Sequence, residues 1–274
     1  MTSEQKTIKN LAIALAWVLV IMIIVSAVSA VTGILGLLSL LDRKDTVISG
    51  ELVSAQFDPD EIDSLSIDLR ATEFEIVTGD TLKVDTTNNR ISVRQSGKKL
   101  IIEEREQKLF EDNEATKTTV YLPADKEFKE LELDTGAGSV TVEKISVEKL
   151  ELDLGAGEVV INEMTVSGSA DIDGGVGRFE LRGGSISDLD LDLGVGKTEI
   201  SASLTGRADI DTGIGNFDLE LIGNRDDYKI QANKGLGSFS IDGTSVTDGQ
   251  TIGNGTNIIQ IDTGIGSANV TFAE

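Results

Sequence analysis

The residues of this sequence that could do chemistry are carboxylates placed at fixed positions before a repeated Gly-x-Gly pair. The pair occurs seven times after residue 131 with an apolar residue between its glycines, and an acidic or amide residue stands two and four places before each of these leading glycines. Two places before it stand Asp134, Asp153, Asp173, Asp192, Asp211, Asn233 and Asp262. Four places before it stand Glu132, Glu151, Asp171, Asp190, Asp209, Gln231 and Gln260. Carboxylate oxygens are the ligands that Ca²⁺ prefers, so the pattern allows a calcium site built without His or Cys.

Two interpretations of the Asp row are open from sequence alone. An Asp just before a turn can accept a hydrogen bond from the backbone N–H two residues on, which explains why the positions nearer the glycine are only Asp and Asn. The alternative is calcium, with the candidate ligands Asp134, Asp153, Asp173, Asp192, Asp211 and Asp262. The phrase differs in period and order from the Gly-Gly-x-Gly-x-Asp repeat of calcium β-rolls, so we predict structural turns and no cofactor.

Catalysis finds little support in the residue types. The chain has no His and no Cys, which excludes imidazole bases, thiolate nucleophiles, disulfides and metal sites ligated by His or Cys. Asp-Thr-Gly at 134–136, 211–213 and 262–264 imitates the aspartic-protease motif, whose two carboxylates form an acid dyad. Here it is one version of the repeat phrase. We therefore predict that the protein is not an enzyme, has no catalytic residue and takes no small-molecule substrate.

The charge balance limits the partners. The formal net charge is −23. A surface this acidic repels nucleic acid at long range, so we expect no nucleic-acid partner.

The carboxylates must be positioned by a repeating fold. The leading glycines are spaced by 19, 20, 19, 19, 22 and 29 residues, and are Gly136, Gly155, Gly175, Gly194, Gly213, Gly235 and Gly264. A period near twenty is typical of a solenoid, in which neighbouring coils bury each other's apolar face. We predict an all-β fold, a parallel β-solenoid with single-strand, β-helix-like coils of about 19–20 residues, seven of them regular over 131–274.

Apolar residues recur in columns around each leading glycine. The positions five before, three before and six after are apolar in all seven coils, and the position four after is apolar except for Thr198. The position one after is also apolar throughout: Ala137, Ala156, Val176, Val195, Ile214, Leu236 and Ile265. Spacing by two within a strand puts side chains on one face, so we predict that all these columns point inward. Each coil then consists of a strand, a glycine corner with positive φ, a second strand and a return turn.

The ends of the repeat region depart from this pattern. Residues 65–76 follow the phrase with Arg70 and Thr72 in place of the two glycines, which predicts a diverged first coil within an irregular segment, 62–130. Further short strands are predicted at 82–84, 91–93, 100–102 and 119–122, separated by turn residues. The extra residues 242–257, rich in Gly, Thr and Asn, predict a surface loop.

The N-terminal part predicts a membrane anchor. Residues 11–41 contain no charge, and 31 residues in a helix span ~46 Å, more than the ~30 Å hydrocarbon core. A cleaved signal peptide ending near Ala30 is the alternative, but the apolar run continues to Leu41. We predict a cytoplasmic tail at 1–10, a transmembrane helix at 11–41 and a stalk at 42–61. The short tail and the long β-rich part favour a single-pass cell-membrane protein with its C-terminal domain extracytoplasmic.

The sequence resembles the bacterial putative-adhesin family, a domain of unknown function. The resemblance is carried by Leu65-Ser66-Ile67, by Val120-Tyr121-Leu122-Pro123 and by the recurring Asp-x-Gly-x-Gly, and covers about residues 62–274. It implies an extracytoplasmic, membrane-tethered, β-solenoid-like domain of bacteria, mostly Gram-positive, sometimes associated with envelope-stress systems. It transfers no catalytic residue.

Together these observations predict a non-catalytic, membrane-anchored surface module, acting as an adhesin or other binding protein of the cell envelope. The expected partners are the membrane, through residues 11–41, and a cell-surface or envelope protein. The alternatives are an accessory or regulatory protein of a membrane envelope-stress sensor, and a calcium-binding surface protein.

Overall fold

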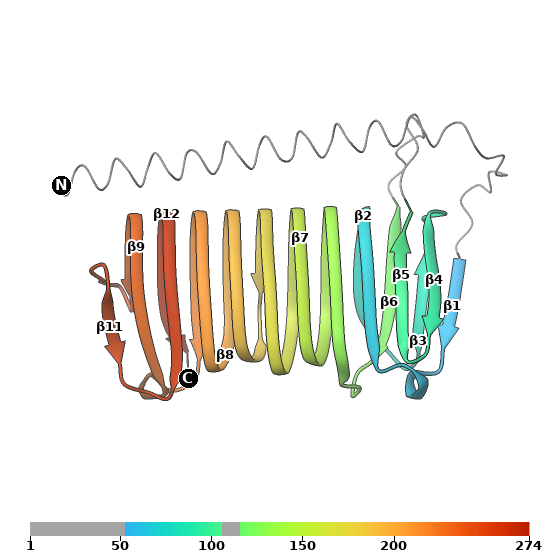
Figure 1. Ribbon diagram of the computed structural model, residues 1–274, viewed down its shortest axis with the longest axis horizontal. Coiled ribbons are helices and arrows are strands. Elements are labelled where there is room, and N and C mark those ends of the chain that lie inside the picture. The colour runs from blue at the N-terminus through green and yellow to red at the C-terminus, as the bar shows by residue number, and fades with distance from the viewer. Residues whose placement is uncertain (1–52, 106–115, 274) are drawn as a thin grey trace, which may run out of the picture. The chain divides into compact units, whose positions relative to one another are not determined.

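The computed structural model describes residues 53–105 and 116–273 (Figure 1). The predicted tail, transmembrane helix and first part of the stalk lie outside these residues. Within the described ranges, no helix is long and apolar enough to cross a membrane.

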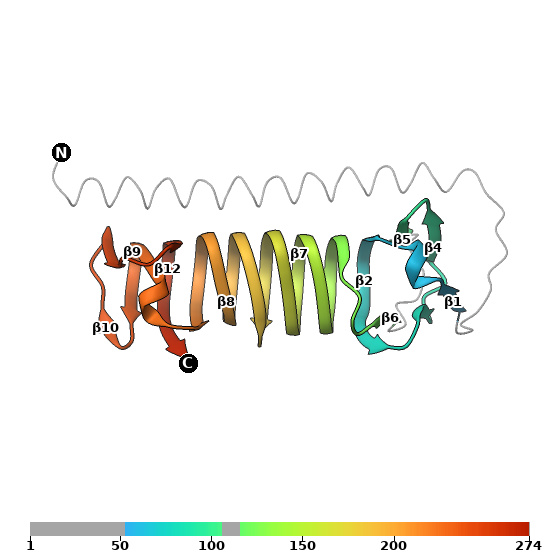
Figure 2. The ribbon, with the colours of Figure 1, turned by 90° about the horizontal axis from the view of Figure 1, so that it is seen from below.

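The described chain is a stack of parallel coils. Strand β7 (Phe128–Leu181) and strand β8 (Gly184–Ile222) each wind through more than one coil without interruption (Figure 2). They pair in parallel with equivalent repeat positions opposite each other, as in Ile172 with Leu191 and Gly177 with Gly196. The predicted parallel β-solenoid is therefore confirmed.

The interior holds four of the five predicted apolar columns. The residues five before, three before, four after and six after each leading glycine are all buried. Val142, Ile161, Leu181 and Ile200, six places after successive glycines, are each at most 4% exposed, and Leu181 lies opposite Ile200. Burial of one such side chain contributes about 1.5–3 kcal/mol, and the row is repeated coil after coil.

In the coils of β7 and β8, unlike the return from β8 to β9 through the 3-10 helix η2 (Arg225–Asp227), the return part is strand and not the predicted turn. Strand β7 continues through it, and its inward residues are buried, among them Ile145, Val147, Met164 and Val166. The pairing of β7 with β8 shifts its register between Val166 and Ala170, which marks a bulge where the coil closes. The sequence pattern hides this third side because the bulge breaks the period of two.

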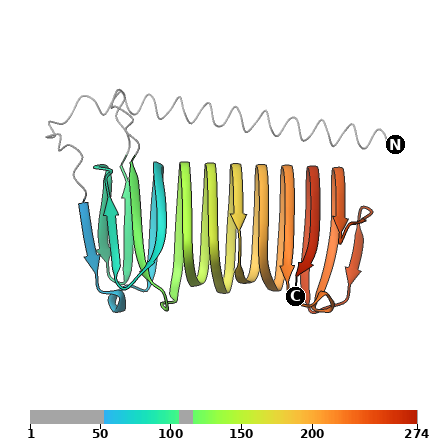
Figure 3. The same cartoon turned by 180° about the vertical axis from the view of Figure 1, so that it is seen from behind.

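The coils at the C-terminal end are stacked out of sequence order. Strand β12 (Asn257–Ala273) lies between β8 and β9 (Tyr228–Ile241) and pairs in parallel with both (Figure 3). Ile261 faces Ile210 of β8 on one side and Ala232 of β9 on the other. The order of the last two coils in the stack is therefore the reverse of their order in the sequence. The repeat phrase does not reveal this, because both coils carry it.

The predicted surface loop at 242–257 instead covers the outer edge of β9. Strands β10 (Thr244–Ser245) and β11 (Gln250–Gly253) pair with β9 in antiparallel fashion, and Val246 between them is buried. An open strand edge invites pairing with other chains, so this segment protects the end of the stack.

The first coil is the diverged one, as predicted. Strand β2 (Ser64–Gly79) pairs with β7 so that Asp68, Ala71 and Thr72 face Asp134, Ala137 and Gly138. On its other side β2 pairs in parallel with β5 (Lys99–Glu104) and β6 (Lys117–Pro123).

Short antiparallel strands complete this end of the sheet. Strand β4 (Ile91–Ser96) pairs with β5, β3 (Leu82–Thr86) with β6, and β1 (Val53–Phe57) with β3. A 3-10 helix, η1 (Pro59–Glu61), links β1 to β2. Strand β1 corrects the predicted stalk, because residues 53–57 belong to the sheet, with Phe57 packed against the core.

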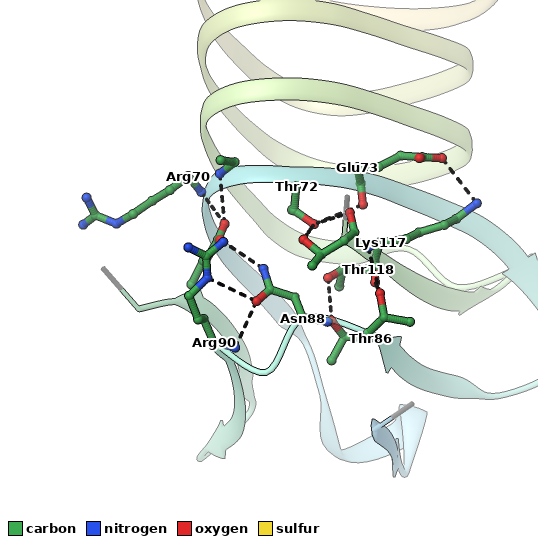
Figure 4. A network of polar contacts seen from close by, with 12 residues as sticks. Arg70, Thr72, Glu73, Thr86, Asn88, Arg90, Lys117 and Thr118 are labelled. Atoms are coloured by element: carbon green, nitrogen blue, oxygen red, sulfur yellow. Dashed lines mark hydrogen bonds and ion pairs between the residues drawn. The ribbon is translucent and has the colours of Figure 1, made fainter. Parts of the chain in front are cut away.

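A buried carboxylate, Glu104, lies beside the diverged first coil, among the polar contacts around Arg70, Asn88 and Arg90 that Figure 4 shows. One oxygen of Glu104 accepts hydrogen bonds from the backbone N–H groups of Arg70 and Ala71 at 2.8 and 3.0 Å. The other accepts from the Asn88 amide at 3.0 Å and from the Arg90 guanidinium at 2.7 Å. Burial alone would raise the pKa of Glu104, but these donors hold it below its ordinary value.

Candidate binding surface: a ridge of aliphatic side chains beside an acidic face

The glycine corners bring the backbones of neighbouring coils into close contact. A Cβ atom added to the second glycine of a pair, such as Gly215, would overlap the carbonyl oxygen of the equivalent Gly196 on the preceding coil. The same holds for the leading glycines, such as Gly213 against Gly194. Only the second glycines have positive φ, for example +148° at Gly215. The leading glycines are therefore required by the close approach and not, as predicted, by positive φ.

The residue between the two glycines points to solvent, which corrects the predicted inward column. In spatial order, Val176, Val195, Ile214, Ile265 and Leu236 are 59%, 46%, 41%, 37% and 45% exposed. Ala71, Ala137 and Ala156 occupy the same position in the earlier coils and are also exposed. The chain turns at the glycines, so the period of two does not continue across the corner. We call this row the corner ridge: Ala71, Ala137, Ala156, Val176, Val195, Ile214, Ile265 and Leu236.

A shallow groove runs along the same corners. Its lining extends from the coil of Leu69 to the coil of Phe217 and includes the half-buried Leu154 and Leu193. The volume of the groove is about 70 Å³. Small-molecule pockets usually measure about 300–1,000 Å³, so the groove adds apolar contact area for a larger partner but does not enclose a ligand.

The predicted carboxylates form an acidic face next to the ridge. The Asp two places before each leading glycine is three residues from a ridge residue, so their Cα atoms are at most about 10 Å apart. Within this row, Asp173 lies opposite Asp192 and Asp211 opposite Asp262. We define the acidic face by the two carboxylate columns: Glu132, Asp134, Glu151, Asp153, Asp171, Asp173, Asp190, Asp192, Asp209, Asp211 and Asp262.

The row nearest the ridge carries uncompensated charge. In the described part of the chain, no ion pair involves Asp153, Asp173, Asp192, Asp211 or Asp262. On the other flank of the ridge the charges are paired. Arg178 contacts Glu158 at 3.2 Å and Glu199 at 2.9 Å, and Lys197 contacts Glu199 at 2.7 Å. The electrostatic potential is therefore more negative on the flank of the ridge that carries the Asp row than on the flank where the charges are paired.

The pKa values of the Asp side chains on the acidic face reflect their burial and their closeness to one another. Burial, followed by the charge of neighbouring carboxylates, raises the pKa of Asp134, Asp153, Asp173, Asp190 and Asp211 above the ordinary value. The predicted Asx-turns are wrong, because in residues 53–105 and 116–273 no backbone N–H donates to the Asp row two places before the glycines.

We expect the thermal stability to pass through a maximum at mildly acidic pH. An Asp with a raised pKa in the folded state stabilises the fold below its unfolded pKa of about 4, and this contribution is lost as the pH rises through the folded pKa. The melting temperature should therefore rise as the pH falls from 7 toward about 5. Below about pH 4 it should fall, since carboxylates with lowered pKa such as Glu104 and Asp63 then lose their charge.

Melting curves recorded between about pH 3.5 and 7.5 check this expectation. Asp173→Asn should raise the midpoint at pH 7 by about 1–3 °C, since each like-charge opposition removed is worth about 0.2–1 kcal/mol. Asp173→Asn should also reduce the rise in melting temperature between pH 7 and about pH 5. The exposed Asp218→Asn, on another side of the coil, is the control. A melting temperature that falls steadily from pH 7 to 5 would contradict the raised pKa values assigned to the acidic face.

The calcium candidates lie in one row, but the geometry does not gather them around a point. Among the described residues there is no group of three or more acidic side chains placed to hold a metal ion. We therefore expect millimolar CaCl₂ to change the melting temperature no more than MgCl₂ at equal concentration, because only charge screening acts. A rise with calcium that magnesium does not reproduce, lost in Asp192→Asn, would establish a calcium site.

Sequence reasoning missed two features of the structure, the corner ridge and the buried Glu104. It placed the ridge inside, although its uniform apolarity was visible. It also did not single out Glu104, whose partners lie up to 34 residues away, and no local pattern marks such a residue.

Comparisons with known proteins identify the family of the chain. The family profile described as Toastrack DUF4097 matches residues 62–261, and no curated protein matches the chain. A solved structure of a putative cell adhesion protein from Clostridium sporogenes is 16% identical, with 82% of this chain and 100% of that chain covered and a TM-score of 0.40. A putative adhesin from Bacteroides fragilis is 12% identical, with 81% and 98% covered and a TM-score of 0.34.

A third solved structure, a putative lipid binding protein from Parabacteroides distasonis, is 15% identical, with 85% of this chain and 100% of that chain covered and a TM-score of 0.32. The family match extends over most of the sequence, from the diverged first coil into the last one. The chain therefore belongs to the Toastrack DUF4097 family.

Proposed function

We propose that this protein is a non-catalytic binding module of the bacterial cell surface, and that the corner ridge is its contact surface. One observation carries the proposal. At all eight corners of the stack the solvent-facing residue is apolar, from Ala71 at one end to Leu236 at the other. Contiguous exposed apolar rows are typical of interaction sites.

Stability alone does not account for the ridge. A side chain such as Val176, which is 59% exposed, gains little from folding because most of its surface stays in water. Polar residues would be tolerated at such positions and would improve solubility. The uniform choice of aliphatic residues therefore favours contact with a partner.

The proposal also includes a membrane anchor at the N-terminus and a location of the solenoid outside the cell. The uncharged run at 11–41 supports attachment to the cell membrane, with the solenoid extracytoplasmic. External protease added to intact cells should remove a tag placed after residue 274 and spare a tag placed before residue 1. The opposite result would place the solenoid in the cytoplasm and overturn the surface function.

The binding test uses the full chain displayed on cells. Val195→Ser with Ile214→Ser should reduce adhesion of these cells to isolated cell envelopes at least tenfold, while the expression level is unchanged. Val53→Ser is the matched control, since Val53 is 54% exposed but lies on β1, away from the ridge. Equal adhesion by the ridge variant and the control would refute the ridge as contact surface.

A further inference from the structure

The charge and shape around the corner ridge specify a chemical class of partner. This step rests on the proposed binding function and adds what is bound. The relevant features are the aliphatic row, the unpaired Asp row on one flank, and the paired charges on the other flank. We infer that the ridge and the acidic face together bind a cationic amphipathic helix.

The length of the ridge suits a short helix. Five large aliphatic residues stand on adjacent coils, from Val176 to Leu236, and adjacent strands are about 4.8 Å apart. The row is therefore about 19 Å long. A helix of about 13 residues has this length, and its apolar stripe presents a side chain about every 5.4 Å, close to the spacing of the ridge.

The charges beside the ridge determine the orientation of the bound helix about its own axis. An apolar stripe on the ridge places the residues on one side of the stripe above the Asp row of the acidic face. That row has raised pKa values and no ion pairs over its central part, so Lys or Arg side chains would relieve its mutual repulsion. The other flank, where Arg178 and Lys197 are already paired with Glu199, adds no comparable attraction.

Neither a second copy nor an anionic membrane fits as well. A second copy carries the same acidic face, and its net charge of −23 adds repulsion. An anionic lipid surface is repelled by the same Asp row.

The test measures binding of a synthetic 14-residue Leu/Lys amphipathic peptide to the full chain in detergent micelles, with empty micelles as the blank because they also bind such peptides. Titration followed by circular dichroism and calorimetry should show, above this blank, saturable binding with the peptide becoming helical, weakened by added NaCl. A peptide with Lys replaced by Glu, and one with Leu replaced by Ser, should each bind at least tenfold more weakly.

Protein variants separate the ridge from general attraction to an acidic protein. Asp173→Asn, Asp192→Asn and Asp211→Asn combined should weaken binding about tenfold or more. The natural Asn233 in the same row shows that an amide fits there. Asp218→Asn, Asp227→Asn and Glu148→Gln combined remove the same net charge elsewhere and should leave binding within about twofold. Val195→Ser with Ile214→Ser should also weaken it about tenfold.

If the two triple variants weaken peptide binding equally, or if the ridge variant does not weaken it, the attraction is unspecific and the inference is overturned. Binding to vesicles of phosphatidylcholine or phosphatidylglycerol that depends on the ridge, without peptide binding, would replace the helix by a lipid surface. Absence of peptide binding while cell adhesion still depends on the ridge refutes this inference alone. Loss of both refutes the binding function itself.

Discussion

Gly215→Ala should unfold or nearly unfold the solenoid, with a loss of about 4 kcal/mol or more in the free energy of unfolding. Gly215 lies in the middle of the stack with φ +148°, which L-residues rarely adopt. A Cβ there would also overlap the carbonyl oxygen of Gly196 on the neighbouring coil. Relief would require moving two coils apart and breaking their ladder. Domains of this kind are stable by only about 5–15 kcal/mol, so the loss is a large fraction.

Urea unfolding followed by circular dichroism measures this loss, and another glycine supplies the control. Gly183 has ordinary φ, and a Cβ added to it would lie 3.4 Å from the Asn162 oxygen, an ordinary contact. Gly183→Ala should change stability by less than about 1 kcal/mol. Gly213→Ala tests the close approach without positive φ and should lie between the two. Equal midpoints for Gly215→Ala and Gly183→Ala would show that the corner can relax.

Glu104→Ala should cost about 3–5 kcal/mol, the range observed when one partner of a buried charge pair is removed. The variant leaves the N–H groups of Arg70 and Ala71 without their acceptor and the Arg90 guanidinium without its carboxylate. The side chain of Glu104 is 1% exposed, so water replaces these contacts poorly. The effect should spread from the N-terminal end, because each coil is stabilised by its neighbours.

The adjacent acidic residue is the control for Glu104. Glu103 also pairs with an arginine, Arg94, at 3.0 Å, but its side chain is 46% exposed. Exposed ion pairs contribute about 0–1 kcal/mol, so Glu103→Ala should be nearly neutral. Hydrogen exchange should show faster exchange at the N–H of Ala71 in Glu104→Ala and no change in Glu103→Ala. Comparable stability of the two variants would mean that Glu104 does not cap the stack.

The parts of the fold that could be predicted are those with strict repetition. The row from Val142 to Ile200 was predicted inward because it recurs at one position of every coil, and burial of an apolar face is what stacking provides. Asp68 and Ala71 identified the diverged coil although both glycines are missing. At Arg70 and Thr72 side chains fit because the described neighbours on that side are Glu104 and Thr116, not another glycine corner.

The errors have physical causes that a sequence does not display. Val195 and Leu191 are both apolar, but the corner between them turns one to solvent and the other inward. That turn lies at the leading glycine, Gly194, where the close approach of the neighbouring coil requires the absence of a Cβ, and sequence periodicity does not encode it. The order of β9 and β12 was not predictable either, since both carry the same phrase and only long-range pairing decides. The acidic face was predicted as a row, but its raised pKa values depend on distances between coils.

The insertion of β12 between β8 and β9 has a consequence for how the protein is made. As the polypeptide is synthesised, the residues of β9 appear before those of β12, their neighbour in the finished sheet. Strand β12 must therefore take its place between β8 and β9 after both have been synthesised. A product terminated prematurely before Asn257 therefore lacks the surface on which β9 docks, and its ragged end exposes apolar residues such as Ile210 and Ile230. A chain that ends before Asn257 should therefore be less stable than the full-length chain and more readily degraded.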